Sequence, residues 1–278
     1  MTSQTWFVTG ASAGIGRSVT ERLLADGHRV AATARRPGAL ADLAEKYPEH
    51  LWTAALDVTD TEQLRAVVER AFAELGRIDV IFSNAGRGSV GAAEELSDEV
   101  IDSQIALNLV APIHLLRATV PHLREQGGGR FIQLSTMGSQ ITTPGASMYH
   151  ASKWGVEGFF ESVIGEVAPF GIGITMVEPG TIRTGFGANL DIAEPLAVYA
   201  SGPVGQLHQY LSSATNITAA GPGDPDKVAA AIIDASVTSP APRRLALGSD
   251  AYAAIKDALT GRLAELEAGK QTAASIDF

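Results

Sequence analysis

The chain has 278 residues, of which 45% are hydrophobic and 19% charged, so it can bury a large core and is not a disordered chain. Its formal net charge of −10 argues against a nucleic acid or an anionic membrane as a partner. The absence of cysteine excludes disulfides and thiolate sites, and with neither a secretory signal nor a run of about 18 apolar residues we expect a cytoplasmic protein without a membrane span.

Short apolar runs alternate along the chain with helical patterns. In chain order we expect strands at residues 5–9, 29–34, 51–56, 79–83, 130–134, 173–177 and 244–247, and helices at 14–25, 61–75, from Ser97 onward, and 148–168. Strands that alternate with helices form β-α-β units, and strands without polar alternation are buried on both faces. The sequence therefore predicts an α/β fold, a Rossmann-type doubly wound parallel sheet of about seven strands with helices on both faces.

Residues 185–225 interrupt this alternation. The chain has no repeat and no linker between folded halves, so we expect one domain over residues 1–278. Residues 185–225 are rich in Gly, Pro, Ala and Ser, and long irregular segments of this kind are often lids or binding loops. We expect this segment to cover the substrate. Its larger side chains fit an apolar or mixed pocket, or equally core packing: Leu190, Ile192, Leu196, Val198, Tyr199, Leu207 and Tyr210.

A glycine-rich turn, TGASAGIG over residues 9–16, joins the first expected strand to the first expected helix. Glycine at Gly10, Gly14 and Gly16 lets the backbone turn tightly and approach a pyrophosphate at the helix N-terminus. The spacing is G-x-x-x-G-x-G rather than G-x-G-x-x-G, and a tight turn can need glycine without any ligand. The strand before it and the helix after it favour dinucleotide binding.

Two arginines, Arg35 and Arg36, follow the second expected strand. An NAD site would favour an acidic residue there, to accept from the ribose hydroxyl. An arginine can instead hold a 2′-phosphate through charge-assisted bonds of about 1.5–3 kcal/mol each. This predicts a preference of roughly 10- to 100-fold for NADP(H) over NAD(H); two ordinary solvated arginines are the alternative.

Tyr149 and Lys153 stand four residues apart, on one face of the helix expected at residues 148–168. An ammonium about 4 Å from the phenol, at an effective dielectric of about 20, favours the phenolate by about 4 kcal/mol. That would bring the tyrosine pKa from about 10 to near 7, where acid–base catalysis works best. The same spacing also occurs by chance on many helices.

Four motifs in one order resemble the short-chain dehydrogenase/reductase family. They are the glycine-rich turn, Ser83-Asn84-Ala85-Gly86 after the fourth strand, Tyr149 with Lys153, and Pro179-Gly180 after the sixth strand. The resemblance covers residues 5–184 closely and the rest in general layout. It implies an oxidoreductase that interconverts a small-molecule carbonyl and an alcohol with NADP(H), assembled as a homo-dimer or homo-tetramer.

The resemblance also assigns the catalytic roles. Tyr149 would be the general acid in reduction and the base in oxidation, and Lys153 would lower its pKa and bind the nicotinamide ribose. Asn108 would hold a water that links Lys153 to solvent, unless its amide simply bonds to backbone. The family's serine, thirteen positions before the tyrosine, is replaced here by Thr136, with Ser135 as the fallback hydroxyl. Threonine keeps the hydroxyl, but its methyl group crowds the pocket.

The same resemblance implies further contacts with the cofactor, in four groups. They are Gly10, Ser12, Gly14, Ile15 and Gly16 at the phosphates, Asp57 and Val58 at the adenine, Asn84, Ala85 and Gly86 as the floor, and Pro179, Gly180, Thr181, Ile182 and Thr184 beside the nicotinamide. For Asn84 a purely structural turn is a serious alternative. The six histidines show no metal-ligand spacing, and we predict no metal.

Two other functions stay open from the sequence. A non-catalytic NADP(H)-binding regulator needs only the nucleotide site, and Thr136 in place of serine is the one feature that favours it. A sugar-nucleotide epimerase or dehydratase would need a larger C-terminal domain than 278 residues accommodate. The apolar character of residues 185–225 favours ketone, aldehyde, steroid-like or polyketide-like substrates over phosphorylated sugars.

Overall fold

A parallel sheet of seven strands forms the centre of the protein, as the computed structural model shows for residues 3–213 and 218–278. The strands lie in the order β3-β2-β1-β4-β6-β7-β9. Their bounds are β1 (Thr5–Thr9), β2 (Arg29–Ala34), β3 (Leu51–Ala55), β4 (Val80–Ser83), β6 (Gly129–Leu134), β7 (Ile172–Pro179) and β9 (Arg244–Leu247). The predicted doubly wound fold is confirmed, with all seven expected strands in the sheet.

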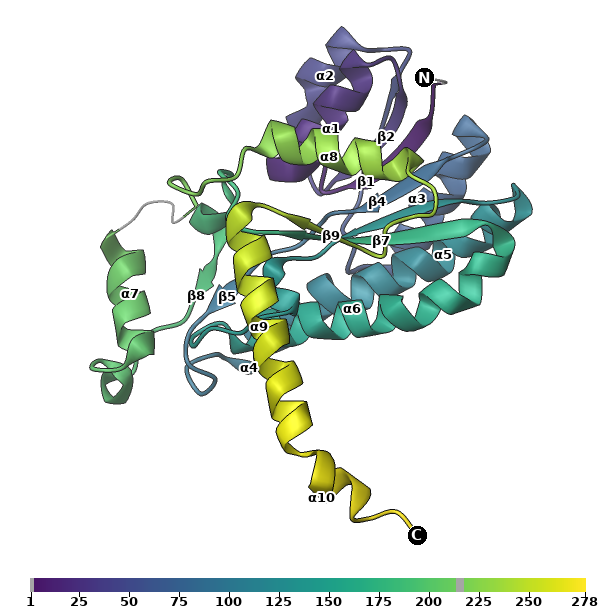
Figure 1. The fold of residues 1–278 in the computed structure, drawn as a ribbon. Helices are drawn as coiled ribbons and strands as arrows, with labels where there is room; N and C mark the ends of the chain where they lie inside the picture. The colour runs from purple at the N-terminus through teal and green to yellow at the C-terminus, as the bar shows by residue number, and fades with distance from the viewer. Residues whose placement is uncertain (1–2, 214–217) are drawn as a thin grey trace.

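Helices cover both faces of this sheet (Figure 1). One face carries α1 (Gly14–Ala25), α2 (Ala41–Lys46) and α8 (Pro225–Val237), and the other carries α3 (Thr61–Leu75), α5 (Ala111–Glu125) and α6 (Ser147–Val167). Side chains of β1 alternate between the two cores. Trp6 and Val8 pack beneath α1 and α8, whereas Phe7 packs against α3, α5 and α6, and all three are fully buried.

Local chemistry sets the ends of several helices. Asp60 caps α3 by accepting from the backbone N–H groups of Glu62 and Gln63, and Gly76 ends that helix with a φ of 75°. Asp224 caps α8 in the same way. Ser97 caps α4 (Asp98–Ile105), the helix that the sequence predicted from Ser97 onward.

The path from α4 to α5 contains a feature that helical periodicity did not predict. One π-helical turn, η2 (Ala106–Val110), joins the two helices. Such turns are rare and are found mostly at functional sites. This turn carries the predicted site residue Asn108.

The strand order of the sheet reverses between β1 and β4. In open α/β sheets, ligands bind outside the carboxyl ends of the strands at this point. The glycine-rich turn follows β1 there, and residues 84–86 follow β4. Strand β7 is longer than the expected 173–177, so Pro179 is the last residue of the strand rather than the first of the next loop.

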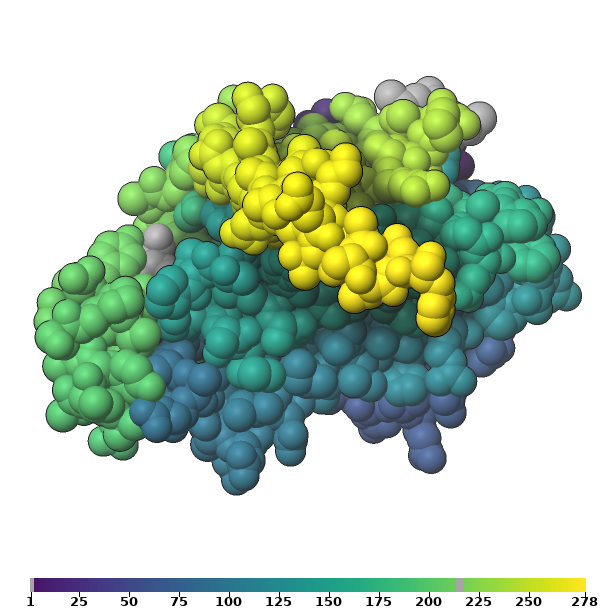
Figure 2. All heavy atoms as spheres, turned by 60° about the horizontal axis from the view of Figure 1, so that its bottom comes forward, coloured from purple at the N-terminus to yellow at the C-terminus, as the bar shows by residue number. Residues whose placement is uncertain are grey.

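The segment expected to be irregular contains ordered elements. They are η5 (Phe186–Asn189), β8 (Asp191–Ile192), η6 (Ala197–Tyr199) and α7 (Pro203–Ser213). Strand β8 pairs with β5 (Ser89–Val90), which ties the segment to the loop after β4. Figure 2 shows α7 at one side of the molecule, coloured green. Residues 214–217 of the predicted substrate-covering segment lie outside the described residues.

The C-terminal part adds a long helix, α9 (Ser249–Ala268), and a short one, α10 (Lys270–Ala274). Helix α9 starts beside β9, passes α6 and extends away from the sheet (Figure 1). Shorter 3₁₀ turns complete the chain: η1 (Pro37–Leu40), η3 (Met137–Ser139) and η4 (Ala168–Phe170). Within the described residues, none of the helices combines the length and the apolar character that a membrane span requires.

Candidate active site

The turn after β1 has the backbone geometry of an anion cradle. Gly10 and Gly14 have φ values of 65° and 53°, which favour glycine. A Cβ at Gly16 would overlap the Asn84 side chain and would lie 2.5 Å from the carbonyl oxygen of Gly10. The Asn84 amide donates to the carbonyls of Thr9 (2.9 Å) and Gly10 (3.1 Å). Asn84 therefore braces this turn, whatever else it contacts.

Helix α1 begins at this turn without a side-chain cap. Its N-cap residue is Ala13, which offers no oxygen to the backbone N–H groups of the first turn. Uncapped N–H groups and the positive end of the helix dipole together favour a bound anion. The Thr184 side chain lies 3.6 Å from the position of a Cβ on Gly14, so the loop after β7 reaches the same cradle. Ser12 and Ile15, the other predicted residues of the turn, are half-buried.

The second and third strands end in the residues predicted for the adenine side. Arg35 and Arg36 directly follow β2 and are exposed, and Val58 is buried. Asp57 accepts from the hydroxyl of Thr59 at 2.7 Å and from its N–H at 3.0 Å. These bonds lower the pKa of Asp57, and the Arg35 guanidinium lowers it further. The two strand ends thus lie within electrostatic reach of each other.

The turn after β6 carries both candidate hydroxyl groups, those of Ser135 and Thr136. The Thr136 hydroxyl accepts from the N–H of Gly138 at 3.2 Å and is hydrogen-bonded to Tyr149. The other predicted hydroxyl, Ser135 Oγ, is buried and bonds to none of the described residues. Of the two alternatives, Thr136 is therefore the residue that meets the tyrosine.

Tyr149 and Lys153 are neighbours on one face of α6, but the Lys153 ammonium does not lie beside the phenol oxygen of Tyr149. Lys153 Nζ is 5.9 Å from the centroid of the Tyr149 ring and donates to the Leu134 carbonyl at 3.0 Å. Burial raises the pKa of Tyr149 to about 12, against the lowering effect of the bond from Thr136. Burial also lowers the pKa of Lys153 to about 8, opposed by Glu157. The predicted fall of the tyrosine pKa toward 7 is wrong for this arrangement, because desolvation outweighs a distant ammonium.

Asn108 connects the π-helical turn to the loop after β4. Its Oδ1 accepts from the N–H of Arg87 at 3.1 Å, and its Nδ2 donates to the Arg87 carbonyl at 2.8 Å. Nδ2 also lies 3.3 Å from Ser152 Oγ on α6. A Cβ on Gly86 would lie 3.2 Å from Asn108 Oδ1 and 3.9 Å from Lys153 Nζ, so the glycine keeps the space between these groups open. The amide thus bonds to backbone, and the water-holding role stays a prediction.

The loop after β7 is held by a residue that the sequence did not point to. Asp250, at the start of α9, accepts from the N–H of Thr181 at 2.8 Å. Its carboxylate also occupies the place that a Cβ on Gly180 would need. Ile182 is buried and forms a bridge with Gly223. Asp250 is 69 residues from Thr181, and no local pattern links them.

His150 is a second residue that sequence reasoning missed. The N–H of Thr143 donates to its Nε2 at 3.0 Å, so its Nδ1 carries the proton and donates to the Gly138 carbonyl at 2.7 Å. The imidazole thus clamps both ends of the turn that begins at Thr136.

Apolar side chains from residues 185–213 border the site. The Phe186 ring lies 6.0 Å from that of Tyr149, centroid to centroid. Leu190 packs against Gly88, and Leu207 packs against Gly145. The segment forms one wall beside the tyrosine.

This wall is fastened by a buried carboxylate. Glu95, whose side chain is fully buried, accepts from the N–H of Leu196 at 2.8 Å and lies 3.0 Å from His208 Nε2 on α7. An ion pair of 3.1 Å between Arg87 and Asp191 adds a second link. Burial opposes ionisation of Glu95, but its bonds to His208 and to two backbone N–H groups outweigh burial and lower its pKa.

Known proteins of one class resemble this chain. A family model described as short chain dehydrogenase matches residues 4–195. An oxidoreductase from Botryotinia fuckeliana is 36% identical over 251 residues, which cover 88% of this chain and 89% of that protein. A 3-ketodihydrosphingosine reductase from Bacteroides thetaiotaomicron is 34% identical over 194 residues, 70% of each chain.

The crystal structure of a short-chain dehydrogenase from Streptomyces avermitilis superposes with a TM-score of 0.91 at 39% identity and covers 99% of both chains. The seven-stranded parallel sheet with helices around it is the Rossmann-like fold of such dehydrogenase structures. This chain belongs to the short-chain dehydrogenase family and is an oxidoreductase of the class that acts on CH–OH groups.

Proposed function

We propose that this oxidoreductase interconverts a carbonyl and an alcohol with NADP(H), and that Tyr149 is its general acid and base. The observation that carries the proposal is the meeting of the Thr136 and Tyr149 hydroxyls at the carboxyl edge of the sheet, near the buried Lys153. Two hydroxyls that converge on one point can both bond to a single carbonyl oxygen. A glycine cradle at the same edge provides for the cofactor.

The residues of the crevice fit a dinucleotide. The uncapped start of α1, with Gly10, Gly14 and Gly16, would hold the pyrophosphate, and Arg35 and Arg36 would hold a 2′-phosphate. When bound, the nicotinamide supplies or takes up the hydride. The protein's part is to bind, to orient and to move a proton.

The proton step follows from the pKa values of the two central residues. In reduction, the Thr136 hydroxyl would donate to the carbonyl oxygen while Tyr149 Oη transfers its proton to that oxygen. A Tyr149 pKa of about 12 keeps the phenol protonated at neutral pH, so the acid is in its active form. A Lys153 pKa of about 8 keeps most of the ammonium charged at pH 7, where it stabilises the tyrosinate that forms. This pairing favours reduction near neutral pH, because oxidation needs the rarer phenolate.

The wall beside Tyr149 supports an apolar or mixed carbonyl substrate. Phe186, Leu190 and Leu207 present hydrocarbon toward the site. The relative from Bacteroides thetaiotaomicron is named for the reduction of a ketone, 3-ketodihydrosphingosine. We therefore place ketones and aldehydes with hydrocarbon substituents ahead of phosphorylated sugars, with residues 185–213 covering the bound substrate.

The alternative of a non-catalytic regulator loses its support. It depended on Thr136 in place of serine, and the Thr136 hydroxyl keeps a hydrogen bond to Tyr149.

A panel assay tests the proposal. NADPH consumption is measured against ketones and aldehydes that range from short and polar to long and apolar, and each is repeated with NADH. We expect turnover, faster with NADPH and with the apolar compounds. Tight NADPH binding without turnover of any carbonyl, and without NADP⁺ reduction by any alcohol, would contradict it.

A further inference from the structure

Helix α9 contacts two of the loops at the carboxyl edge of the sheet, although it lies beyond residues 4–195, which the family model matches. It follows β9 and packs against that strand and against the turn η3. Its first turn carries Asp250, which reaches the loop after β7. Arg262, twelve residues further along the same helix, reaches the turn after β6. One helix is therefore bonded to the segments that follow two neighbouring strands.

The contact at Asp250 depends on residues on both sides of it. Asp250 Oδ2 accepts from the N–H of Thr181 at 2.8 Å. A Cβ on Gly180 would overlap the Asp250 carboxylate, and so would a Cβ on Gly248, whose φ of 117° favours glycine in any case. An acidic residue in a first helical turn often serves only the helix dipole. That role would need neither glycine, so the two glycines indicate a fitted place for the carboxylate.

The loop after β7 is also held from its other side. The N–H of Gly223 donates to the Thr181 carbonyl at 3.1 Å, and the N–H of Arg183 donates to the Gly223 carbonyl at 2.9 Å. Both polar groups of the Thr181 backbone are thus bonded, one to Asp250 and one to Gly223. The backbone at Thr181 therefore has a fixed direction, and loss of Asp250 would free one side of it.

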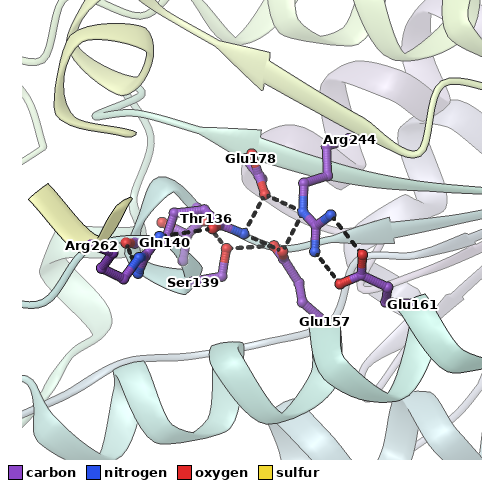
Figure 3. Close-up of polar contacts among 8 residues, drawn as sticks. All are labelled: Thr136, Ser139, Gln140, Glu157, Glu161, Glu178, Arg244 and Arg262. Carbon is purple, nitrogen blue, oxygen red and sulfur yellow. Dashed lines mark hydrogen bonds and ion pairs between the residues drawn. The ribbon is translucent and has the colours of Figure 1, made fainter. Parts of the chain in front are cut away.

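Arg262 holds the turn after β6 (Figure 3). Its guanidinium donates to the Gln140 carbonyl at 2.8 Å and to Gln140 Oε1 at 3.3 Å. The Gln140 amide nitrogen then faces two buried carboxyl groups and donates to Glu157 at 2.9 Å and to Glu178 at 3.1 Å. The guanidinium also lies over the Trp154 ring, 4.9 Å from its centroid. Arg262 thus joins the turn after β6 to both α6 and β7.

Carbonyl reduction requires these two segments to keep a fixed separation. Under the proposed function the hydride comes from a nicotinamide beside Thr181, and the proton comes from Tyr149 beside Thr136. A displacement of about 1 Å between reacting groups can cost about 100-fold in rate. The pairing of β6 with β7 ends at Leu134 and Val177, before either segment begins. A helix bonded to both segments supplies the constraint that the strands do not extend to them.

We propose that Asp250 and Arg262 are positioning residues for the reaction: through them α9 holds the loop beside the nicotinamide and the turn that presents Thr136 at one separation. Both residues act through the segments that they bond. The effect on catalysis rests on the function proposed above, whereas the hold of α9 on the two segments is measurable without a substrate.

Three substitutions separate position from charge. Asp250→Ala removes the acceptor for Thr181, whereas Asp250→Asn keeps an acceptor of the same shape without the charge. Arg262→Met removes the hydrogen-bonding guanidinium and keeps a hydrocarbon chain of similar length. Asp257→Ala and Lys256→Met are the matched controls, since both residues are exposed on the same helix.

The kinetic readouts are kcat with the best carbonyl of the panel and the isotope effect on kcat when NADPH carries deuterium at both C4 positions. We expect Asp250→Ala and Arg262→Met each to lower kcat by about 10- to 100-fold and to raise the isotope effect, because misplaced groups slow the hydride step itself. Asp250→Asn and both controls should stay within about threefold of the wild-type kcat. Loss of folded protein alone would lower the rate and leave the isotope effect unchanged.

The double variant Asp250→Ala/Arg262→Met tests whether the two residues fix one separation. If they do, its loss of kcat is smaller than the product of the two single losses, because either change alone already releases the constraint. Single variants with the wild-type kcat and isotope effect, or single losses that multiply in the double variant, would overturn the proposal.

Amide hydrogen exchange measures the hold of α9 without a substrate. Asp250→Ala should speed exchange in residues 180–184, and Arg262→Met in residues 137–141, each by about tenfold, while the two controls leave both segments at the wild-type rate. Exchange at the wild-type rate in both segments of both variants would overturn the proposal. If the wild type turns over no carbonyl, the proposed function fails, and the exchange rates still decide whether α9 holds the two segments.

Discussion

The turns after β1 and β6 stand at the same edge of one parallel sheet but are built differently. The first is shaped by backbone: glycines with positive φ, an uncapped helix and one bracing amide from Asn84. The second is shaped by side chains that converge from helices α6 and α9 and strands β7 and β9, among them His150, Glu157 and Arg262. A backbone cradle suits a phosphate, which accepts N–H groups of any residue, whereas a proton transfer needs particular hydroxyls at fixed positions.

Because of this difference, we expect substitutions in the two turns to change different kinetic parameters, and experiments can test this. Changes around the second turn should lower kcat and leave cofactor affinity nearly unchanged. Changes on the side of the first turn should alter cofactor choice and leave kcat nearly unchanged. Changes in residues 185–213 or their fastening should act on the substrate KM.

Among the residues around Tyr149, the largest effect is expected for Lys153→Ala. Loss of the ammonium should lower kcat by roughly 10²- to 10⁴-fold, because the tyrosinate loses its stabilising charge. Burial lowers the pKa of Lys153 to about 8, so the wild-type kcat for reduction should be level below pH 8 and fall as the lysine deprotonates above it. The variant should lose that fall. A NADPH Kd that rises as much as kcat drops would show that Lys153 serves binding instead.

The second effect concerns the hydroxyl beside the tyrosine. Thr136→Ala should lower kcat by about 10²-fold, the usual cost of removing one hydrogen-bond donor to a developing charge. Thr136→Ser should retain most of the activity because it keeps the hydroxyl. Ser135→Ala is the matched control and should resemble the wild type. Steady-state rates of the three variants check this, and a loss confined to Ser135→Ala would move the role to Ser135.

A smaller effect tests the cofactor side. Replacing Arg35 and Arg36 by alanine should reduce the ratio of kcat/KM for NADPH to that for NADH by roughly 10- to 100-fold, since the bonds to a 2′-phosphate are lost. Arg22→Ala is the control, because Arg22 is also an exposed arginine but lies on α1. A wild-type enzyme that prefers NADH would contradict this assignment.

The smallest effect is expected when the contacts that hold residues 185–213 in place are weakened. Glu95→Gln keeps the shape of the side chain but weakens its bonds to Leu196 and His208. The substrate KM should rise about threefold to tenfold with little change in kcat. Since its bonds lower the pKa of Glu95, the fastening should hold at neutral pH and weaken only as the carboxylate protonates in acid. Glu99→Gln is an exposed control, and equal KM values in both would contradict the role of Glu95.

The contrast between the two turns also explains what the sequence could predict. A glycine with positive φ is a local requirement, so the first turn is visible in residues 9–16 alone. The seven central strands are apolar runs and were equally visible. Tyr149 and Lys153 follow from helical spacing, and the hydroxyl at Thr136 followed from its distance to the tyrosine along the chain.

What the sequence could not predict depends on partners far along the chain. Arg262 meets Gln140 across 122 residues, and Asp250 meets Thr181 across 69. The hydrophobic periodicity of the sequence did not predict the π-helical turn at Asn108 or the helix α7. Spacing also did not reveal that the ammonium of Lys153 turns to the Leu134 carbonyl, and for this reason the pKa expected for the tyrosine was too low.

The most direct test of the account is Tyr149→Phe, which keeps the ring and its burial and removes only the hydroxyl. NADPH consumption with the best carbonyl of the panel is compared with the NADPH Kd of the same preparation. We predict that kcat falls by about 10³-fold or more while the Kd stays within about twofold, since the proton donor is lost and the glycine cradle is unchanged. Reduction of the same carbonyl at the wild-type rate by Tyr149→Phe would contradict the central claim.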